Sequence, residues 1–158
     1  MKTASTSEIK KELSNATPRE LLELCLRLAR FKKDNKELMS YLLFEAPDLQ
    51  GYIESIKKDM DEQIEQINRS SLYFAKKGLR KILKTTNKFI KYTLSKETEV
   101  ELLIYYCKKI KASGIKINRS TALKNLYNTV LKKIGTTAGN LHEDLQHDYN
   151  KELEQLAL

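Results

Sequence analysis

The 24 residues from Ser70 to Thr93 contain seven basic residues and no acidic residue, and they constrain the fold more than any other stretch. At 100° per residue, the apolar and the basic side chains separate onto different sides of a helix. The apolar side holds Leu72, Ala75, Leu79, Ile82, Leu83, Thr86, Phe89, Ile90 and Thr93. The other side, named here the basic face, holds Tyr73, Lys76, Lys77, Arg80, Lys81, Lys84, Lys88 and Lys91. The stretch predicts one helix that buries the first side and presents the second.

The rest of the chain is also predicted to be helical. Only five glycines and two prolines interrupt 158 residues, and no segment has the alternation of a strand. The length suits one domain, residues 1–158, that buries a proper core. We expect an all-α fold of about eight helices.

Residues that cap helices mark several of the expected starts. The side chains of Ser5, Thr17, Asp48 and Ser95 stand where they can accept hydrogen bonds from the first free amides of a helix. The expected interruptions are a corner at Asp34–Asn35, a helix end at Gly135 with a loop to Asn140, and a last helix from Leu141 to Leu156.

A weak repeat suggests how the helices are arranged. Similar apolar patterns begin at Leu38, Leu79 and Leu123, at intervals of 41 and 44 residues. This interval is typical of helix-pair repeats of the HEAT and armadillo kind. We therefore expect stacked antiparallel hairpins in an α-solenoid, with a closed helical bundle as the alternative.

Three pieces of the chain carry a resemblance to a known family. They are TPRELLELCLRLARFKKDNKELMSYL, the lysine-dotted helix leading into EVELLIYYCKKIKASGI, and LYNTVLKKI leading into LHEDLQHDYNKEL. In this layout the chain resembles a family of small, all-helical bacterial proteins catalogued as a domain of unknown function. The resemblance implies an α-helical fold. It implies no activity, ligand or site residue.

Charge is unevenly distributed along the chain. Residues 1–67 have a net charge of −2, residues 68–134 of +14, and residues 135–158 of −4. The basic face is therefore the main candidate site for an anion or a partner. Two readings remain open: the basic middle faces an anionic partner, or the acidic ends fold over it and neutralise it.

Other candidate sites are weaker. Residues His142 to Asp148 hold histidine and carboxylate side chains, but their spacing diverges around a helix, so no metal site is predicted. Tyrosines 41, 52, 105 and 106 could line a ligand groove, although tyrosines on helices usually pack at a core edge. Cys25 and Cys107 lie in apolar runs and are expected to be reduced and buried.

No catalytic motif or phosphate-binding loop is present, so we expect neither an enzyme nor a cofactor. The leading prediction is a non-enzymatic helical scaffold that binds another protein, with a homodimer among the alternatives. The alternative function is weakly sequence-specific nucleic-acid binding through the helix at 72–93. The longest apolar run has six residues, so no membrane span is expected, and we expect a cytoplasmic protein of bacterial origin.

Overall fold

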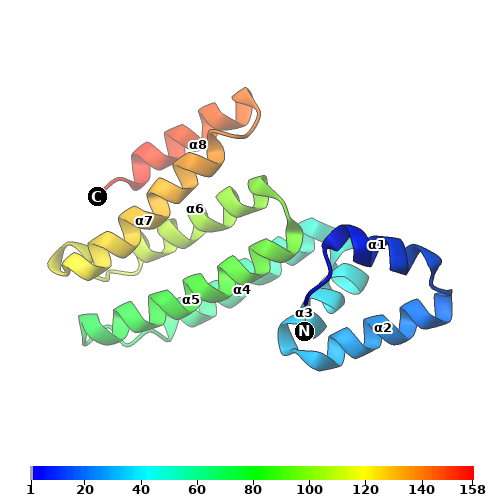
Figure 1. Ribbon diagram of the computed structural model, residues 1–158. Helices are drawn as coiled ribbons and strands as arrows, with labels where there is room; N and C mark the ends of the chain where they lie inside the picture. Colours follow the sequence, from blue (N-terminus) through cyan, green and yellow to red (C-terminus); the bar gives the residue numbers. More distant parts are fainter. Residues whose placement is uncertain (1) are drawn as a thin grey trace. The chain divides into compact units, whose positions relative to one another are not determined.

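The computed structural model describes residues 2–158, and all its regular structure in that range is helical (Figure 1). The prediction of an all-α fold is confirmed. The α-helices are α1 (Thr6–Asn15), α2 (Pro18–Phe31), α3 (Lys33–Ser40), α4 (Leu49–Glu65), α5 (Leu72–Thr93), α6 (Lys96–Ala112), α7 (Thr121–Ala138) and α8 (Glu143–Leu156). A π-helical turn (Tyr41–Glu45) and two 3₁₀ turns (Ala46–Asp48, Ile117–Arg119) join some of them.

The chain divides into two compact units, unit 1 (Met1–Glu45) and unit 2 (Ala46–Leu158). The expectation of a single domain over residues 1–158 stays a prediction. Each described helix of either unit is too short or too polar to span a bilayer.

Unit 1 is built on a hairpin of α2 and α3, which are joined through Lys32 and pack against each other. The predicted capping boxes form at Ser5 with Glu8 and at Thr17 with Glu20. None of the residues of α1, α2 and α3 is buried. Large apolar side chains of α2 remain exposed. Leu22, Leu28 and Phe31 are 59%, 57% and 75% exposed, because one short partner helix cannot cover them.

Unit 2 is organised around α6. This helix packs against α4, α5, α7 and α8, and eight of its residues are buried. Four neighbours for one helix occur in a stack of hairpins, where a helix contacts its own partner and the helices of the adjoining hairpins, as well as in a closed bundle. The α-solenoid arrangement is therefore not confirmed, and both arrangements fit the contacts within unit 2 (Figure 1).

Two predicted boundaries differ from the structure. Asp34 and Asn35 lie inside α3 rather than at a corner, and Asn35 donates a 2.9 Å hydrogen bond to the carbonyl of Leu28. Gly135 does not end its helix, because α7 continues to the buried Ala138. A Cβ at Gly135 would lie 3.8 Å from the side chain of Leu153 in α8, an ordinary contact distance, so α7 passes through this position without a steric need for glycine.

Candidate anion-binding surface

The predicted two-sided helix exists as α5, which covers Leu72–Thr93. Its buried residues all come from the predicted apolar side: Ala75, Leu79, Ile82, Thr86 and Ile90. α5 packs against α4, α6 and α7, which fixes its rotation about its own axis. The basic face is consequently turned away from the centre of unit 2.

Most of the basic face is open to solvent. Lys76 and Lys88 are half-buried, while the other six residues are exposed: Tyr73, Lys77, Arg80, Lys81, Lys84 and Lys91. The two half-buried lysines lie near aromatic rings. The Nζ atom of Lys76 is 5.9 Å from the ring centre of Tyr73, and that of Lys88 is 5.5 Å from the ring centre of Phe89.

The exposed cations of the basic face have no acidic partners among the described residues. Lys77, Arg80, Lys81, Lys84 and Lys91 form no ion pair in that part of the chain, which includes the acidic helix α4 directly beside α5. Five uncompensated positive charges on one helix create a positive potential that attracts anions. The structure therefore leaves this charge available to a ligand.

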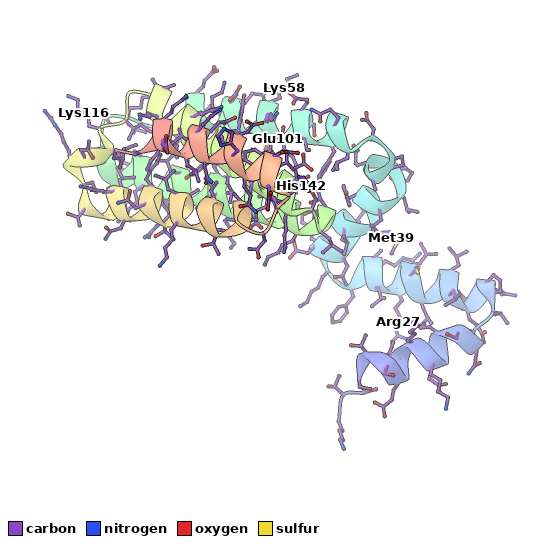
Figure 2. The ribbon with its side chains drawn as sticks, turned by 90° about the horizontal axis from the view of Figure 1, so that it is seen from above. Arg27, Met39, Lys58, Glu101, Lys116 and His142 are labelled. Carbon is purple, nitrogen blue, oxygen red and sulfur yellow. The ribbon has the colours of Figure 1, made fainter. Side chains whose placement is uncertain are left out.

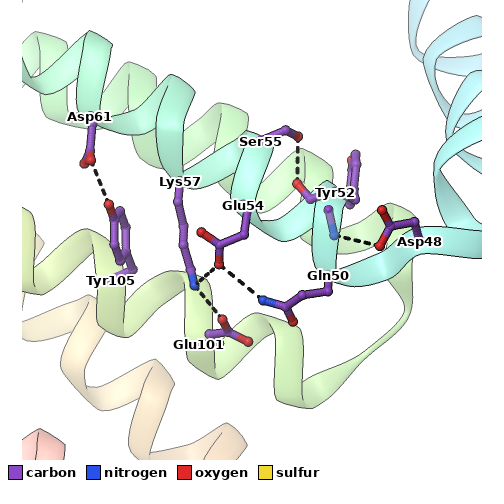
Figure 3. Close-up of polar contacts among 10 residues, drawn as sticks. Asp48, Gln50, Tyr52, Glu54, Ser55, Lys57, Asp61, Glu101 and Tyr105 are labelled. Carbon is purple, nitrogen blue, oxygen red and sulfur yellow. Dashed lines mark hydrogen bonds and ion pairs between the residues drawn. The ribbon is translucent and has the colours of Figure 1, made fainter.

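The polar side chains of α4 make their contacts within α4 and with α6 (Figure 3). The ammonium group of Lys57 lies 2.7 Å from carboxylate oxygens of both Glu54 and Glu101. Partial burial of Lys57 lowers its pKa, but the hydrogen bonds to Glu101 and Glu54 outweigh this effect and raise the pKa above its ordinary value. Glu54 and Glu101 thus compensate a lysine that is not part of the basic face.

A second group pairs α4 with α6 one turn further along. Oδ2 of Asp61 accepts hydrogen bonds of 2.7 Å from both Tyr105 and Lys109. The bond to Asp61 raises the pKa of Lys109, and burial together with the same carboxylate raises that of Tyr105. On the α8 side, Lys108 forms a 2.7 Å ion pair with Glu152. Asp61 and Glu152 therefore compensate lysines of α6, whereas the exposed cations of α5 have no acidic partner among the described residues.

The neighbouring helix α7 adds a lysine beside α5 to this surface, which the sequence patterns did not indicate. Neither α5 nor α7 contains an aspartate or glutamate, and the two helices are in contact. Lys133 of α7 donates a 2.8 Å hydrogen bond to Asn87 of α5 and is also paired with Glu99. The signal that could have revealed this surface is the absence of any acid between Leu102 and His142.

The histidine segment offers no metal site. His142 caps α8 by accepting a hydrogen bond from the amide of Asp144, and it lies at the start of that helix (Figure 2). Within residues 2–158, no group of three or more histidine, cysteine or carboxylate side chains is arranged to hold a metal ion.

Three of the four tyrosines that were candidates for lining a groove, Tyr52, Tyr105 and Tyr106, contact neighbouring helices. Tyr106 is fully buried, and its hydroxyl donates to the carbonyl of Leu79. The ring of Tyr52 packs edge-on against Phe89. Tyr105 binds Asp61 as described above. These tyrosines therefore form helix contacts, and Tyr105 also lines a small pocket together with Lys57, Glu101 and Tyr149.

The two cysteines occupy different environments. Both are free thiols, but Cys107 is buried and Cys25 is exposed, so the prediction that Cys25 is buried is wrong. The apolar side chains around Cys25 occupy more of the surface of α2 than α3 covers. Burial raises the pKa of the Cys107 thiol to about 12, which leaves it protonated and unreactive at neutral pH.

Comparisons of the chain with protein-family models, with curated proteins and with solved structures found no match. The resemblance to an all-helical bacterial family thus stays a prediction.

Proposed function

We propose that this chain is a non-enzymatic binding module that holds nucleic acid, with little sequence preference, through the basic face of α5. The observation that carries the proposal is the set of five exposed cations on α5 without an acidic partner. A phosphate backbone is the ligand that matches such a row, because lysine and arginine displace its condensed counterions when they bind.

The composition of the basic face supports binding without sequence readout. Arg80 is the only arginine among its seven cations. Arginine is the residue that most often reads guanine in a bidentate manner, whereas lysine contacts phosphate as a point charge. Lysines on one exposed helix therefore favour backbone contacts over contacts with base edges.

The direct test is a fluorescence-anisotropy titration of labelled oligonucleotides at several salt concentrations. We expect binding that weakens steeply with salt, with a slope of log K against log salt of roughly −3.5 if five cations contact a single strand. The variant Lys81→Gln/Lys84→Gln should bind about tenfold more weakly and reduce the slope by roughly 1.4.

A matched variant controls for net charge. Lys58→Gln/Lys151→Gln also removes two positive charges, from exposed residues of α4 and α8 that form no ion pair among the described residues (Lys58 is labelled in Figure 2). This variant should bind like the parent chain. Equal weakening by both variants, or no binding of the parent at low salt, would contradict the proposal.

A second candidate function is the binding of a protein partner through unit 1. It is favoured by the large apolar side chains that unit 1 exposes, among them Leu22, Leu28 and Phe31, since exposed apolar surface often marks an interaction site. Leu22→Glu/Leu28→Glu should abolish capture of a partner from nuclease-treated extract, while Lys81→Gln/Lys84→Gln should not. Sedimentation of the purified chain tests separately whether it self-associates. If the chain is a monomer and captures other proteins only when nucleic acid is present, this candidate is ruled out.

A further inference from the structure

We propose that the nucleic acid bound by the basic face is single-stranded and that one of its bases stacks on Tyr73. This inference rests on the proposed function, because it identifies the class of nucleic acid held at the same surface. Tyr73 lies in the first turn of α5, at the end of the row of cations.

The ring of Tyr73 is unusually available for a residue of this unit. Tyr73 is 64% exposed, and the adjacent Phe74 is 53% exposed. The two rings form an edge-to-face pair with centroids 5.4 Å apart, which supports the tyrosine ring from one side. The hydroxyl of Tyr73 has no hydrogen-bond partner among the described residues.

Other tyrosines of unit 2 are used differently. The hydroxyl groups of Tyr105, Tyr106 and Tyr127 donate to Asp61, to the Leu79 carbonyl and to the Leu156 carbonyl respectively. Each of these bonds joins two helices. Within the described residues, the hydroxyl of Tyr73 links no pair of helices, and its side chain is largely exposed. The packing of unit 2 therefore does not depend on a tyrosine at this position.

Tyr73 lies in line with the cations. The positions Tyr73, Lys77, Arg80, Lys84 and Lys91 follow one another at spacings of four, three, four and seven residues, which keeps them on one side of a helix. Lys76 lies above the ring itself, with Nζ 5.9 Å from its centre. A base on Tyr73 would therefore begin a backbone path that runs along α5 over the lysines.

The exposed ring selects for a single strand. In a duplex the faces of the bases are already stacked on one another. An aromatic side chain on the protein surface then has no free base face to stack on, and binding depends on the phosphate contacts alone. In a single strand the base faces are free, and proteins that bind such strands combine a cationic track with aromatic rings on which bases stack. The combination on α5 has both parts.

The length of the track sets the size of the site. At a rise of about 1.5 Å per residue, Lys77 and Lys91 are roughly 21 Å apart along α5. This distance spans about six phosphates at the roughly 3.4 Å spacing of a stacked strand. A strand of about six to eight nucleotides should fill the site, and a longer one should add little affinity.

The experiment uses the whole chain with Tyr73→Trp. The natural sequence contains no tryptophan, so this variant has a single indole at the proposed stacking position. We expect its fluorescence to be quenched by single-stranded DNA and by single-stranded RNA of twelve nucleotides, and the ratio of the two affinities identifies the preferred nucleic acid. A duplex of twelve base pairs and vesicles of anionic lipid should leave the emission nearly unchanged.

Two further variants test the role of the ring itself. Tyr73→Ala should weaken single-strand binding about tenfold and leave duplex binding unaffected. Tyr73→Phe keeps the ring and loses only the unpaired hydroxyl, so it should bind like the parent. Because Tyr73 is largely exposed, all three variants should melt at the parent temperature, as measured by circular dichroism.

The outcomes separate this inference from the proposed function. If Tyr73→Ala binds single strands as tightly as the parent while Lys81→Gln/Lys84→Gln is weakened, the stacking role is wrong and the basic face stands. A duplex bound as tightly as a single strand also overturns the inference alone. If no oligonucleotide binds, or if only the lipid vesicles do, both proposals fail.

Discussion

The hydroxyl of Tyr106 donates a 2.9 Å hydrogen bond to the main-chain carbonyl oxygen of Leu79, and this bond joins the centre of α6 to α5. Both residues are at most 1% exposed. The contact holds α5 in the rotation that turns its apolar side inward. The orientation of the basic face is thus a consequence of buried packing on the opposite side of the same helix.

Tyr106→Phe should destabilise the chain by about 1 kcal/mol, because the ring still fills its site and only one buried hydrogen bond is lost. Tyr106→Ala should cost about 3–5 kcal/mol, since it also leaves a cavity. Urea unfolding followed by circular dichroism measures both. Equal effects of the two variants would mean that the ring contributes nothing beyond its hydroxyl.

The two thiols should react at very different rates. Cys25 is exposed and should be modified at once by a disulfide reagent in the native protein, whereas Cys107 should react only after unfolding. A spectrophotometric thiol assay should count one fast thiol per chain without denaturant and two with it. Cys25→Ser should remove the fast one. A fast reaction in that variant would show that Cys107 is accessible.

Stability should fall as the pH rises above about 9. The unfolded Cys107 thiol loses its proton near pH 8.5–9, but in the folded chain burial raises its pKa to about 12. The folded state then binds more protons than the unfolded state, so the free energy of unfolding decreases by about 1.4 kcal/mol per pH unit. Burial raises the pKa of Tyr106 as well, which adds to the slope above pH 10.

The measurement is a series of urea titrations between pH 8.5 and 10, a window in which lysines remain largely charged. Cys107→Ala should be less stable at neutral pH but should show a smaller slope within this window. A flat profile in the parent chain would contradict the burial of the thiol.

The backbone positions that follow α5 and α6 offer a pair of substitutions with opposite expected signs. Leu94 ends α5 with a φ of 53°, a left-handed conformation that favours glycine. Its side chain is 91% exposed, so no packing of the leucine offsets the cost of this conformation. Leu94→Gly should stabilise the chain by up to about 1 kcal/mol. Gly114 has a φ of 75° with open space around it, and Gly114→Ala should destabilise by about 1 kcal/mol. Thermal melts of both variants test the pair.

Local signals made much of the fold predictable. The capping boxes at Ser5 and Thr17 depend on residues three positions apart, and both form as expected. The two sides of α5 follow from helical periodicity, and its bounds agree with the prediction. Gly135 shows where a local signal fails, because α7 continues past it to the buried Ala138.

Long-range pairing was not predictable from the sequence. The acidic residues of α4 immediately precede α5 in the chain, but Asp61 binds Tyr105 and Lys109 of α6. Which lysines an acidic helix neutralises depends on which helix packs against its polar side, and spacing within one segment carries no such information. The exposure of Cys25 was missed for a related reason, because an apolar run does not reveal how many neighbours cover it.

The uncompensated row on α5 also affects the free protein. Lys77, Lys81 and Lys84 lie one helical turn apart, and like charges at that spacing repel one another. The unliganded chain therefore carries an internal electrostatic strain that salt screens and that a bound polyanion removes. Folding and ligand binding are thermodynamically linked at this helix, so occupancy of α5 should be visible as a rise in melting temperature.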